Sequence, residues 1–372
     1  MRIGILGTRG IPNHYGGFEQ WAELLSQGLV KLGCEVYVYN SHNHPYQEKT
    51  WNGVNIIHKY DPEYKIGTAG QFIYDLNCIL DSRKRNFDVI LQLGFTSSSI
   101  WGWLQPRKNT FVVTNMDGIE WVREKFSKPV QNFLKYAEKL AVRFSDCLIA
   151  DSPVIEDYYN TNYSKAVEYI SYGTEIFDNE DSSKIESFNV NPYNYNLLIA
   201  RLEPENNIET IIKGVLKSNT TYPLLVVGNP KIPHGKYLFE KYSEEEKIRF
   251  VGSIYDLEIL DNLRFFSNVY FHGHSVGGTN PSLLEAMASS ARIIAHDNPY
   301  NRSVLDNNGN FFSSSEQISN LLNEAKNKEN YSEYLQKNLQ RINDEFLTEN
   351  VIQQYYTLFK KNTKFYNEVV KS

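Results

Sequence analysis

Residues 269–288 of this 372-residue chain read VYFHGHSVGGTNPSLLEAMA. The first four residues predict a buried strand, and Pro281 opens a run of good helix formers. Asn280 or Thr279 suits the helix cap, and two glycines in the loop let the backbone approach another group closely. A strand that leads straight into a helix is the repeating unit of a parallel sheet, so this stretch predicts an α/β fold.

The same alternation runs along the whole chain. In the first half, apolar runs predict strands at 3–7, 36–40, 54–60, 89–94, 111–115, 148–151 and 167–171, with amphipathic helices at 18–32, 70–82 and 130–144. After a polar stretch, the alternation restarts with strands at 197–200, 224–227, 248–251, 269–272 and 292–295. We therefore expect two doubly wound lobes, each a mostly parallel sheet with helices on both faces.

The polar stretch places a domain boundary near 175–195. The predicted domains are an N-terminal lobe at 1–180, a C-terminal lobe at 190–348 and a final helix at 349–372. This helix is long enough to leave its own lobe, and we expect it to pack on the N-terminal lobe. Ligands of open α/β sheets bind at the carboxyl ends of the strands, so a cleft between two facing lobes is the expected site.

Composition excludes several classes of protein. The net charge of −6 is spread over both halves of the chain, which argues against a nucleic-acid binder. Cys34, Cys78 and Cys147 have neither disulfide-framework nor zinc-site spacing, so a reducing compartment is expected. The first residues do not resemble a signal peptide, and no apolar run approaches the roughly 20 residues of a membrane span. We expect a cytoplasmic protein.

The loop at 274–280 is a candidate phosphate site. Unpaired N–H groups and the positive end of the helix dipole favour an anion at such a loop. Glu285 lies one turn into the helix, where its carboxylate is placed to accept hydrogen bonds from ribose hydroxyls. The alternative is an ordinary tight turn with a normal helix cap.

Two further segments point to the same chemistry. Residues 7–17, GTRGIPNHYGG, form a long glycine-rich loop after the first strand, suited to lie over a phosphate. Arg201 follows the strand at 197–200 and is suited to a bidentate phosphate contact. The alternatives are a flexible surface loop at 7–17 and a surface ion pair of Arg201 with Glu203 or Glu205.

Five motifs in order resemble the retaining GT-B glycosyltransferases of family 4, over nearly the whole chain. That family has a glycine pair, an R-L-x-P-E segment, two strand ends of the V-G and F-x-G type and a helix with L-E-A-M-A. The matching residues here are Gly16-Gly17, 201–205 (RLEPE), Val227-Gly228, 250–252 (FVG) and 284–288 (LEAMA). The resemblance implies a GT-B fold of two Rossmann-like lobes facing an interlobe cleft. It implies that the N-terminal lobe (1–180) binds the acceptor and that the C-terminal lobe (190–348) binds the nucleotide sugar.

Other segments look closer to one branch of that family, the bacterial rhamnosyltransferases of capsule and cell-wall polysaccharide assembly. They are 7–12 (GTRGIP), 15–19 (YGGFE), 115–121 (NMDGIEW) and 277–281 (GGTNP). This branch implies transfer of L-rhamnose from dTDP-rhamnose, with retention, onto a lipid-linked oligosaccharide. A UDP- or GDP-sugar donor is one alternative, and a catalytically silent module that binds sugar nucleotides is another.

The chain departs from the general family pattern at three positions. Gly277 replaces a Glu, Asn206 replaces a Lys and Met116 replaces a His. Each change removes a polar contact to sugar or phosphate. Either this branch handles a less hydroxylated sugar, as a 6-deoxy sugar is, or catalysis is impaired.

The resemblance also implies the site residues. No metal or other cofactor is expected, because helix N-termini and Arg201 would stabilise the leaving diphosphate of the nucleotide-sugar substrate. Asp117 and Arg201 are the expected catalytic residues, although Asp117 also suits a helix cap or turn. The expected donor-binding residues are Gly16, Gly17, Arg201, Asn206, Gly228, Ser253, Ile254, Ser275, Gly278, Thr279, Asn280 and Glu285. The expected acceptor-binding residues are His14, Tyr15, Asp117 and Glu120.

Two other groups of residues have competing interpretations. The pairs His42/His44 and His272/His274 are spaced to share a strand face as metal ligands, but no further ligand accompanies them, which favours ordinary loop histidines. A basic, partly apolar segment suits either a solvated helix face or peripheral contact with the inner face of the plasma membrane. Its residues are Trp121, Lys125, Phe126, Lys128, Phe133, Lys135, Lys139 and Arg143.

Overall fold

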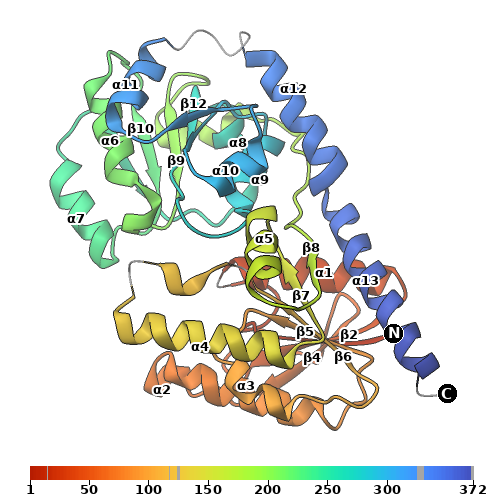
Figure 1. Ribbon diagram of the computed structural model, residues 1–372. Helices are drawn as coiled ribbons and strands as arrows, with labels where there is room; N and C mark the ends of the chain where they lie inside the picture. The colour runs from red at the N-terminus through yellow and green to blue at the C-terminus, as the bar shows by residue number, and fades with distance from the viewer. Residues whose placement is uncertain (15, 117, 124–125, 325–330, 370–372) are drawn as a thin grey trace. The chain divides into compact units, whose positions relative to one another are not determined.

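The computed structural model describes residues 1–14, 16–116, 118–123, 126–324 and 331–369 (Figure 1). The chain divides into two compact units, of which unit 1 comprises Met1–Gly173 and Thr348–Ser372 and unit 2 comprises Thr174–Leu347. The division at 173/174 lies at the near edge of the polar stretch where the sequence placed the boundary. The final helix, α13 (Thr348–Val369), groups with the N-terminal part of the chain.

Unit 1 is built on a sheet in the order β3-β4-β2-β1-β5-β6-β7-β8. Its strands are β1 (Arg2–Leu6), β2 (Glu35–Ser41), β3 (Thr50–Trp51), β4 (Val54–Lys59), β5 (Val89–Leu93), β6 (Phe111–Asn115), β7 (Cys147–Ala150) and β8 (Val167–Tyr169). Only the β3–β4 pair is antiparallel among the described strands. The chain runs outward from β1 to β2 and then from β5 the other way, so the strand order switches between β1 and β5.

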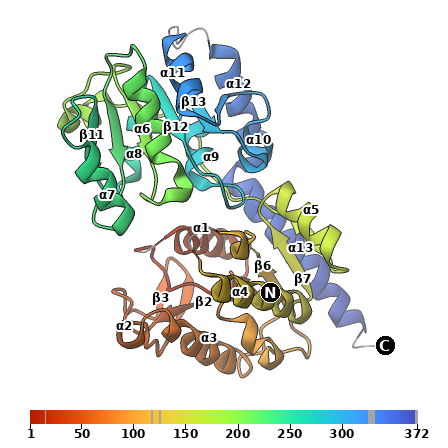
Figure 2. The ribbon, with the colours of Figure 1, turned by 60° about the vertical axis from the view of Figure 1, so that its left-hand side comes forward.

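Helices cover both faces of this sheet (Figures 1 and 2). They are α1 (Gly17–Lys31), α2 (Glu63–Ile66), α3 (Ala69–Ser82), α4 (Lys128–Phe144), α5 (Pro153–Asn162) and α13, with the short turns η1 (Ser99–Leu104) and η2 (Glu120–Val122). On one face α1 packs with α13, where Trp21 contacts Tyr355 and the Tyr355 hydroxyl lies 3.2 Å from the Asn115 amide nitrogen. On the other face Tyr74 and Ile79 of α3 join a buried cluster with Ile90 of β5.

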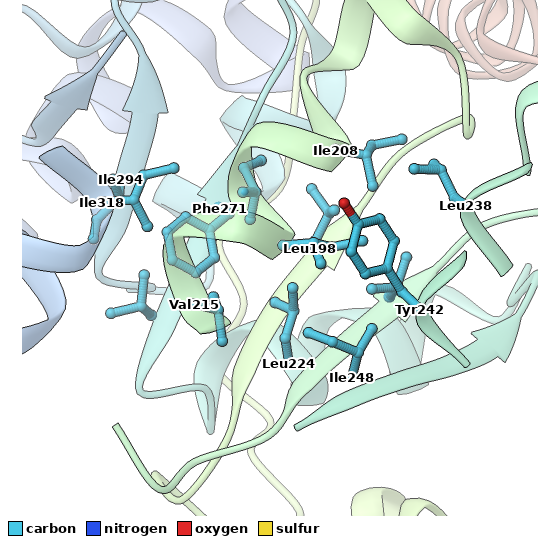
Figure 3. Packing of buried hydrophobic residues seen from close by; sticks show 14 of the residues in the cluster. Leu198, Ile208, Val215, Leu224, Leu238, Tyr242, Ile248, Phe271, Ile294 and Ile318 are labelled. Atoms are coloured by element: carbon cyan, nitrogen blue, oxygen red, sulfur yellow. The ribbon is translucent and has the colours of Figure 1, made fainter. Parts of the chain in front are cut away.

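Unit 2 has a parallel sheet in the order β11-β10-β9-β12-β13-β14. Its strands are β9 (Asn196–Ile199), β10 (Leu224–Val227), β11 (Ile248–Gly252), β12 (Val269–His272), β13 (Ile293–His296) and β14 (Asn310–Phe312). Leu198 and Phe271 point from neighbouring strands into a core that Ile208 and Val215 cover from one helix (Figure 3). Here the strand order switches between β9 and β12.

The helices of unit 2 are mostly short. They are α6 (Ile208–Lys217), α7 (Pro233–Tyr242), α8 (Leu257–Phe265), α9 (Pro281–Ala288), α10 (Pro299–Leu305), α11 (Ser315–Asn323) and α12 (Ser332–Arg341), with turns η3 (Ser182–Phe188), η4 (Pro204–Asn206) and η6 (Ile342–Phe346). The tail predicted to be helical from 316 onward is helical in α11, α12 and α13, and residues 325–330 lie outside the described part. Of the helices that the structure describes, none is long and apolar enough to cross a membrane.

Candidate functional site

Two loops of unit 2 leave the sheet side by side, because β9 and β12 are paired neighbours. Arg201 lies just after β9, and the loop 273–280 follows β12. Their strands flank the point where the strand order switches, which is where open α/β sheets bind ligands. The structure therefore brings two of the predicted phosphate-binding segments to one edge of one sheet.

The loop after β12 is tied to the segment that carries Arg201. Ser275 donates both its backbone N–H and its hydroxyl to the Glu205 carbonyl, at 3.1 and 2.7 Å. The Asn207 amide donates to the Gly273 carbonyl at 2.9 Å. A Cβ at Gly273 would lie 2.0 Å from the Asn206 carbonyl oxygen, so only glycine allows this approach. Ser275, expected to bind the donor, thus already anchors the loop.

The amides that remain available at this edge lie in the loop and not in the first turn of α9. Asn280 caps the helix, accepting from Ser282 N–H on its side chain and from Leu283 N–H on its carbonyl, both at 3.0 Å. The amides of Val276, Gly277 and Gly278 donate no hydrogen bond within the described part of the chain. The expectation of unpaired helix N–H groups is therefore corrected: the unpaired donors precede the cap.

The Arg201 side chain is exposed and makes no hydrogen bond or ion pair with any residue that the structure describes. The alternative ion pair with Glu203 or Glu205 is not formed. The backbone carbonyl of Arg201, in contrast, accepts hydrogen bonds from Glu203 N–H and from the Asn206 side chain, both at 2.7 Å. Asn206 is buried, and its amide holds the turn instead of facing outward, so we no longer expect it to contact a donor directly.

Glu285 is held by a residue that the sequence analysis missed. Arg264 of α8 is 1% exposed and pairs with the carboxylates of both Glu285 and Asp261. A buried guanidinium needs such partners, and the pair fixes where the Glu285 carboxylate lies. The side chain of Glu285 keeps 19% of its exposure. Only the basic residue in the apolar run LRFF at 263–266 signalled this contact in the sequence.

The remaining expected donor residues lie at the ends of β10 and β11. A Cβ at Gly228 would lie 2.3 Å from the Ala200 carbonyl, so glycine lets the ends of β9 and β10 approach each other. Ser253 is exposed directly after β11 and Ile254 is half-buried. Tyr255 follows them with 85% of its surface exposed, an aromatic face that the sequence analysis passed over.

Hydrogen bonds tie residues 9–12 of the glycine-rich loop to neighbouring segments of unit 1. Arg9 N–H donates to Glu19 at 2.9 Å. The Asn40 side chain bonds both the N–H and the carbonyl of Ile11, at 3.1 and 2.7 Å. A ring nitrogen of His44 lies 3.1 Å from the Pro12 carbonyl.

Helix α1 begins with its N–H groups open, unlike α9. Gly16 occupies the cap position and has no side chain to bond them. The amides of Gly17, Phe18 and Glu19 donate no hydrogen bond to the described residues. No atom lies within 4 Å of where a Cβ would stand on Gly17. An open helix N-terminus of this kind favours an anion.

The residues expected to bind the acceptor are only partly described. Tyr15 and Asp117 lie outside the described residues. His14 is exposed and packs edge-on against His44, with ring centroids 4.3 Å apart. Glu120 lies in η2 and forms an ion pair with Arg123 at 2.8 Å. Met116, which replaces the family's His, is fully buried.

A pocket of about 180 Å³ lies at the switch point of unit 1. It is lined by the loops after β1 and β5 and by side chains of α2 and α3. Asp75 lies in this lining and accepts a hydrogen bond from Ser97 at 2.5 Å. Burial raises the pKa of Asp75 to about 7, although the Ser97 hydrogen bond opposes the shift. Of the expected acceptor residues that the structure describes, neither His14 nor Glu120 lines this pocket.

The histidine pairs gain no third ligand. Within the part of the chain that the structure covers, no group of three His, Cys, Asp or Glu side chains is placed to hold a metal ion. His42 accepts from Asp61 N–H at 3.0 Å, so it has a role in its loop. His272 stacks on His274 at 4.5 Å, and burial lowers the pKa of His272 well below its usual value, which keeps it neutral.

Family models match both units. Residues 1–175 match the model described as "Domain of unknown function (DUF1972)", and residues 179–341 match "Glycosyl transferases group 1". A comparison with curated proteins finds no match.

Solved structures share the fold over nearly the full length. Sucrose-phosphate synthase from Thermosynechococcus elongatus is 18% identical with a TM-score of 0.77, covering 97% of this chain and 98% of its own. Anabaena HepE, solved in complex with UDP and glucose, is 15% identical with a TM-score of 0.75, covering 97% and 100%. The catalytic domain of starch synthase IV from Arabidopsis thaliana, bound to ADP and acarbose, is 13% identical with a TM-score of 0.73, covering 98% and 99%.

These likenesses show the GT-B fold, with a parallel sheet in each of two Rossmann-like units. The model of group 1 glycosyl transferases matches residues 179–341, which lie within unit 2.

Proposed function

We propose that this group 1 glycosyltransferase of GT-B fold moves L-rhamnose from dTDP-rhamnose, with retention and without a metal, onto a lipid-linked oligosaccharide of a bacterial surface polysaccharide. One observation carries the donor assignment. The guanidinium of Arg201 and the amides of Val276, Gly277 and Gly278 occupy the same edge of the unit 2 sheet, and none of them bonds a residue that the structure describes. Such donors stabilise negative charge that develops on a leaving diphosphate.

We assign the other residues roles according to which of their hydrogen-bonding groups could reach a ligand. The open amides of Gly17, Phe18 and Glu19 are a second set of anion donors, carried by unit 1. Glu285, oriented by Arg264, receives the ribose hydroxyls. The leaving phosphate takes the acceptor proton, so no protein nucleophile is needed. Thr279 and Asn280 act mainly by shaping the loop, and we keep Asp117 as the candidate for sugar or acceptor binding.

The choice of a deoxy sugar is supported by Gly277. An acidic residue at this position in the general family would accept hydrogen bonds from sugar hydroxyls. Gly277 has a φ of +118° and open space where a side chain would lie. A sugar with fewer hydroxyls has less need of that acceptor, in agreement with the resemblance to the rhamnosyltransferase branch.

Helix α4 supports peripheral contact with an anionic membrane. Lys128, Lys135, Lys139 and Arg143 are exposed on it, while its only acidic residue, Glu138, is fully buried. Glu138 accepts hydrogen bonds from the hydroxyls of Tyr158 and Tyr163, at 2.8 and 2.6 Å. Lys125, also predicted to belong to this basic segment, lies outside the described residues. A helix with this charge surplus in a chain of net charge −6 suits anionic headgroups.

Vesicle cosedimentation tests that contact. The chain should bind phosphatidylglycerol vesicles and not phosphatidylcholine vesicles, and the double variant Lys135→Glu/Lys139→Glu should bind less. Equal binding to both lipids would contradict contact with anionic headgroups, and binding to neither would remove the membrane from the proposal.

Calorimetry with dTDP, UDP and GDP tests the donor, and turnover of dTDP-rhamnose with a lipid-linked acceptor tests the reaction. We expect dTDP to bind best and rhamnose to be transferred. Preference for UDP or GDP would keep the enzyme and change its donor. Tight dTDP binding without transfer to any lipid-linked sugar would favour the silent sugar-nucleotide module, which the departures at Gly277, Asn206 and Met116 motivate.

A further inference from the structure

The pocket at the β1/β5 switch point differs in chemistry from the diphosphate edge. Its charged side chains are Arg9, Asp61, Glu63 and Asp75. Arg9, the one cation among the described lining residues, is already bound to Glu63 through two hydrogen bonds, at 2.9 and 2.8 Å. Among the described lining residues, carboxyl groups therefore outnumber cations three to one. Such a lining repels phosphate and favours an uncharged ligand that donates hydrogen bonds.

Two polar groups in the lining have unused hydrogen-bonding capacity among the described residues. Thr8 is 3% exposed, and its hydroxyl has no hydrogen-bond partner within the described part of the chain. Ser97 bonds one oxygen of the Asp75 carboxyl, and the other oxygen accepts from no described residue. A buried hydroxyl left without a partner costs free energy, which a ligand hydroxyl at this point would recover.

The walls of the pocket are aromatic. Phe18, Tyr74 and Phe95 line it beside the polar groups. The Tyr74 hydroxyl donates a hydrogen bond to the Tyr39 carbonyl at 2.9 Å, so Tyr74 contributes its ring to the pocket. Apolar walls with a few placed polar groups are the usual lining of a small-molecule site. A sugar ring, with C–H faces and a belt of hydroxyls, matches both features.

We propose that this pocket binds one neutral sugar ring of the acceptor, with Thr8 and Asp75 as the residues that recognise its hydroxyls. The assignment of the ring to the acceptor rests on the proposed transferase function, while the binding of a neutral sugar does not. The Arg9–Glu63 pair and Gln71 form the polar rim, where Gln71 donates to Glu63 at 3.1 Å. Thr8 belongs to the 7–12 motif, whereas Asp75 lies in none of the matched motifs.

Saturation-transfer NMR on the full-length chain tests the pocket. The probes are methyl glycosides of glucose, galactose, mannose, N-acetylglucosamine and rhamnose, with glucose 6-phosphate as the anionic comparison. At least one glycoside should receive saturation, and glucose 6-phosphate should receive little. No transfer to any of the glycosides, or stronger transfer to the phosphate, would overturn the proposal.

Three variants locate the binding. Thr8→Val removes an unpartnered hydroxyl without changing the shape of the side chain, so the fold should keep its stability while glycoside affinity falls about tenfold. Gln71→Trp should block the pocket from α3. Leu80→Trp, on the exposed face of the same helix, is the matched control and should bind as the wild type does. Binding that survives both Thr8→Val and Gln71→Trp would place the sugar elsewhere.

Nucleotide calorimetry on the same samples separates this proposal from the proposed function. If Thr8→Val binds dTDP normally but loses the glycoside, the pocket is a separate sugar site. A second outcome is that the chain binds nucleotide and transfers sugar, while both pocket variants keep wild-type nucleotide binding, sugar transfer and glycoside binding. In that case only the pocket assignment fails. If the chain binds glycosides but no nucleotide, the proposed function fails and the sugar pocket stands without its assignment to an acceptor.

Discussion

The two units of this chain use the same kind of edge, the strand-order switch of a parallel sheet, for opposite chemistry. In unit 2 the edge after β9 and β12 presents an unpaired Arg201 guanidinium and unpaired loop amides. In unit 1 the edge after β1 and β5 is a pocket in which Asp61, Glu63 and Asp75 outnumber Arg9. The shared topology fixes where a ligand binds, while the side chains and caps at the edge decide what charge it carries.

The two helix N-termini next to these edges also differ. Asn280 fills the first turn of α9 with its own side chain and carbonyl, whereas Gly16 leaves the first turn of α1 open. The sequence predicts unpaired N–H groups at the start of α9, whereas the structure leaves the first turn of α1 open among the described residues. Whether a helix start is open to a ligand therefore depends on how its cap folds, and not on glycine content alone.

The largest effect is expected where backbone approaches backbone. Gly273→Ala places a Cβ 2.0 Å from the Asn206 carbonyl oxygen, so β12 and η4 must separate at a cost of about 2–4 kcal/mol. Nucleotide binding should fall with it, because Arg201 and the loop lose their register. The matched control is Gly17→Ala, which meets no atom within 4 Å and should leave the free energy of urea unfolding nearly unchanged. Equal effects of the two substitutions would contradict the packing described for unit 2.

The pH dependence of stability probes the unit 1 edge. Burial raises the pKa of Asp75 from 3.8 to about 7. Between these values the folded chain holds one proton more on this carboxyl than the unfolded chain does. The free energy of unfolding should therefore fall as pH rises through this window, by at most about 4 kcal/mol, with no further change above it.

Urea unfolding of the wild type and of Asp75→Asn, from about pH 5 to pH 8, measures the contribution of Asp75 to the pH dependence of the free energy of unfolding. The variant should lose part of the slope and be more stable than the wild type near pH 8. The same slope in both proteins would show that Asp75 is not kept neutral by burial.

Removing the free cation tests the unit 2 edge. Arg201→Ala should weaken dTDP binding by about 1.5–3 kcal/mol, the usual contribution of a hydrogen bond to a charged group. The glycoside affinity of unit 1 should stay the same. Arg249→Ala removes an exposed arginine that bonds only the Asn189 carbonyl among the described residues, and it is the control for charge alone. If calorimetry finds equal losses for the two variants, a specific contact at Arg201 is contradicted.

The smallest effect concerns the base. Tyr255 is exposed beside Ser253 and Ile254, so stacking on a base should contribute only about 0.5–1.5 kcal/mol. Tyr255→Ala should lower affinity for dTDP while Tyr255→Phe keeps it, as measured by calorimetry. An unchanged affinity in the alanine variant would confine base contacts to the backbone of Ser253 and Ile254.

Much of the fold was predictable from the sequence because the strands are short apolar runs buried on both faces. Every predicted strand is present with ends within two residues of the prediction. Strands β3 (Thr50–Trp51) and β14 (Asn310–Phe312) were not predicted, because each is a short segment with no longer apolar run around it.

The site was harder to predict, because it depends on contacts between distant residues. The sequence located Arg201, the loop before α9 and Asn280 as a candidate cap, but not that Asn206 turns inward. The Arg264–Glu285 pair spans 21 positions, and the unit 1 pocket joins residues from Gly7 to Ser98. No local pattern signals such groups, since tertiary packing alone brings them together.

Hydrogen exchange on the full-length chain tests the division of labour between the two edges most directly. Added dTDP should slow exchange of the amides at 276–278, and an added methyl glycoside that binds should slow exchange at 7–9 and 94–98. The nucleotide should not change amide exchange at the unit 1 sheet edge, and the glycoside should not change it at the unit 2 sheet edge. Protection of 94–98 by dTDP, or of 276–278 by the glycoside, would contradict the account.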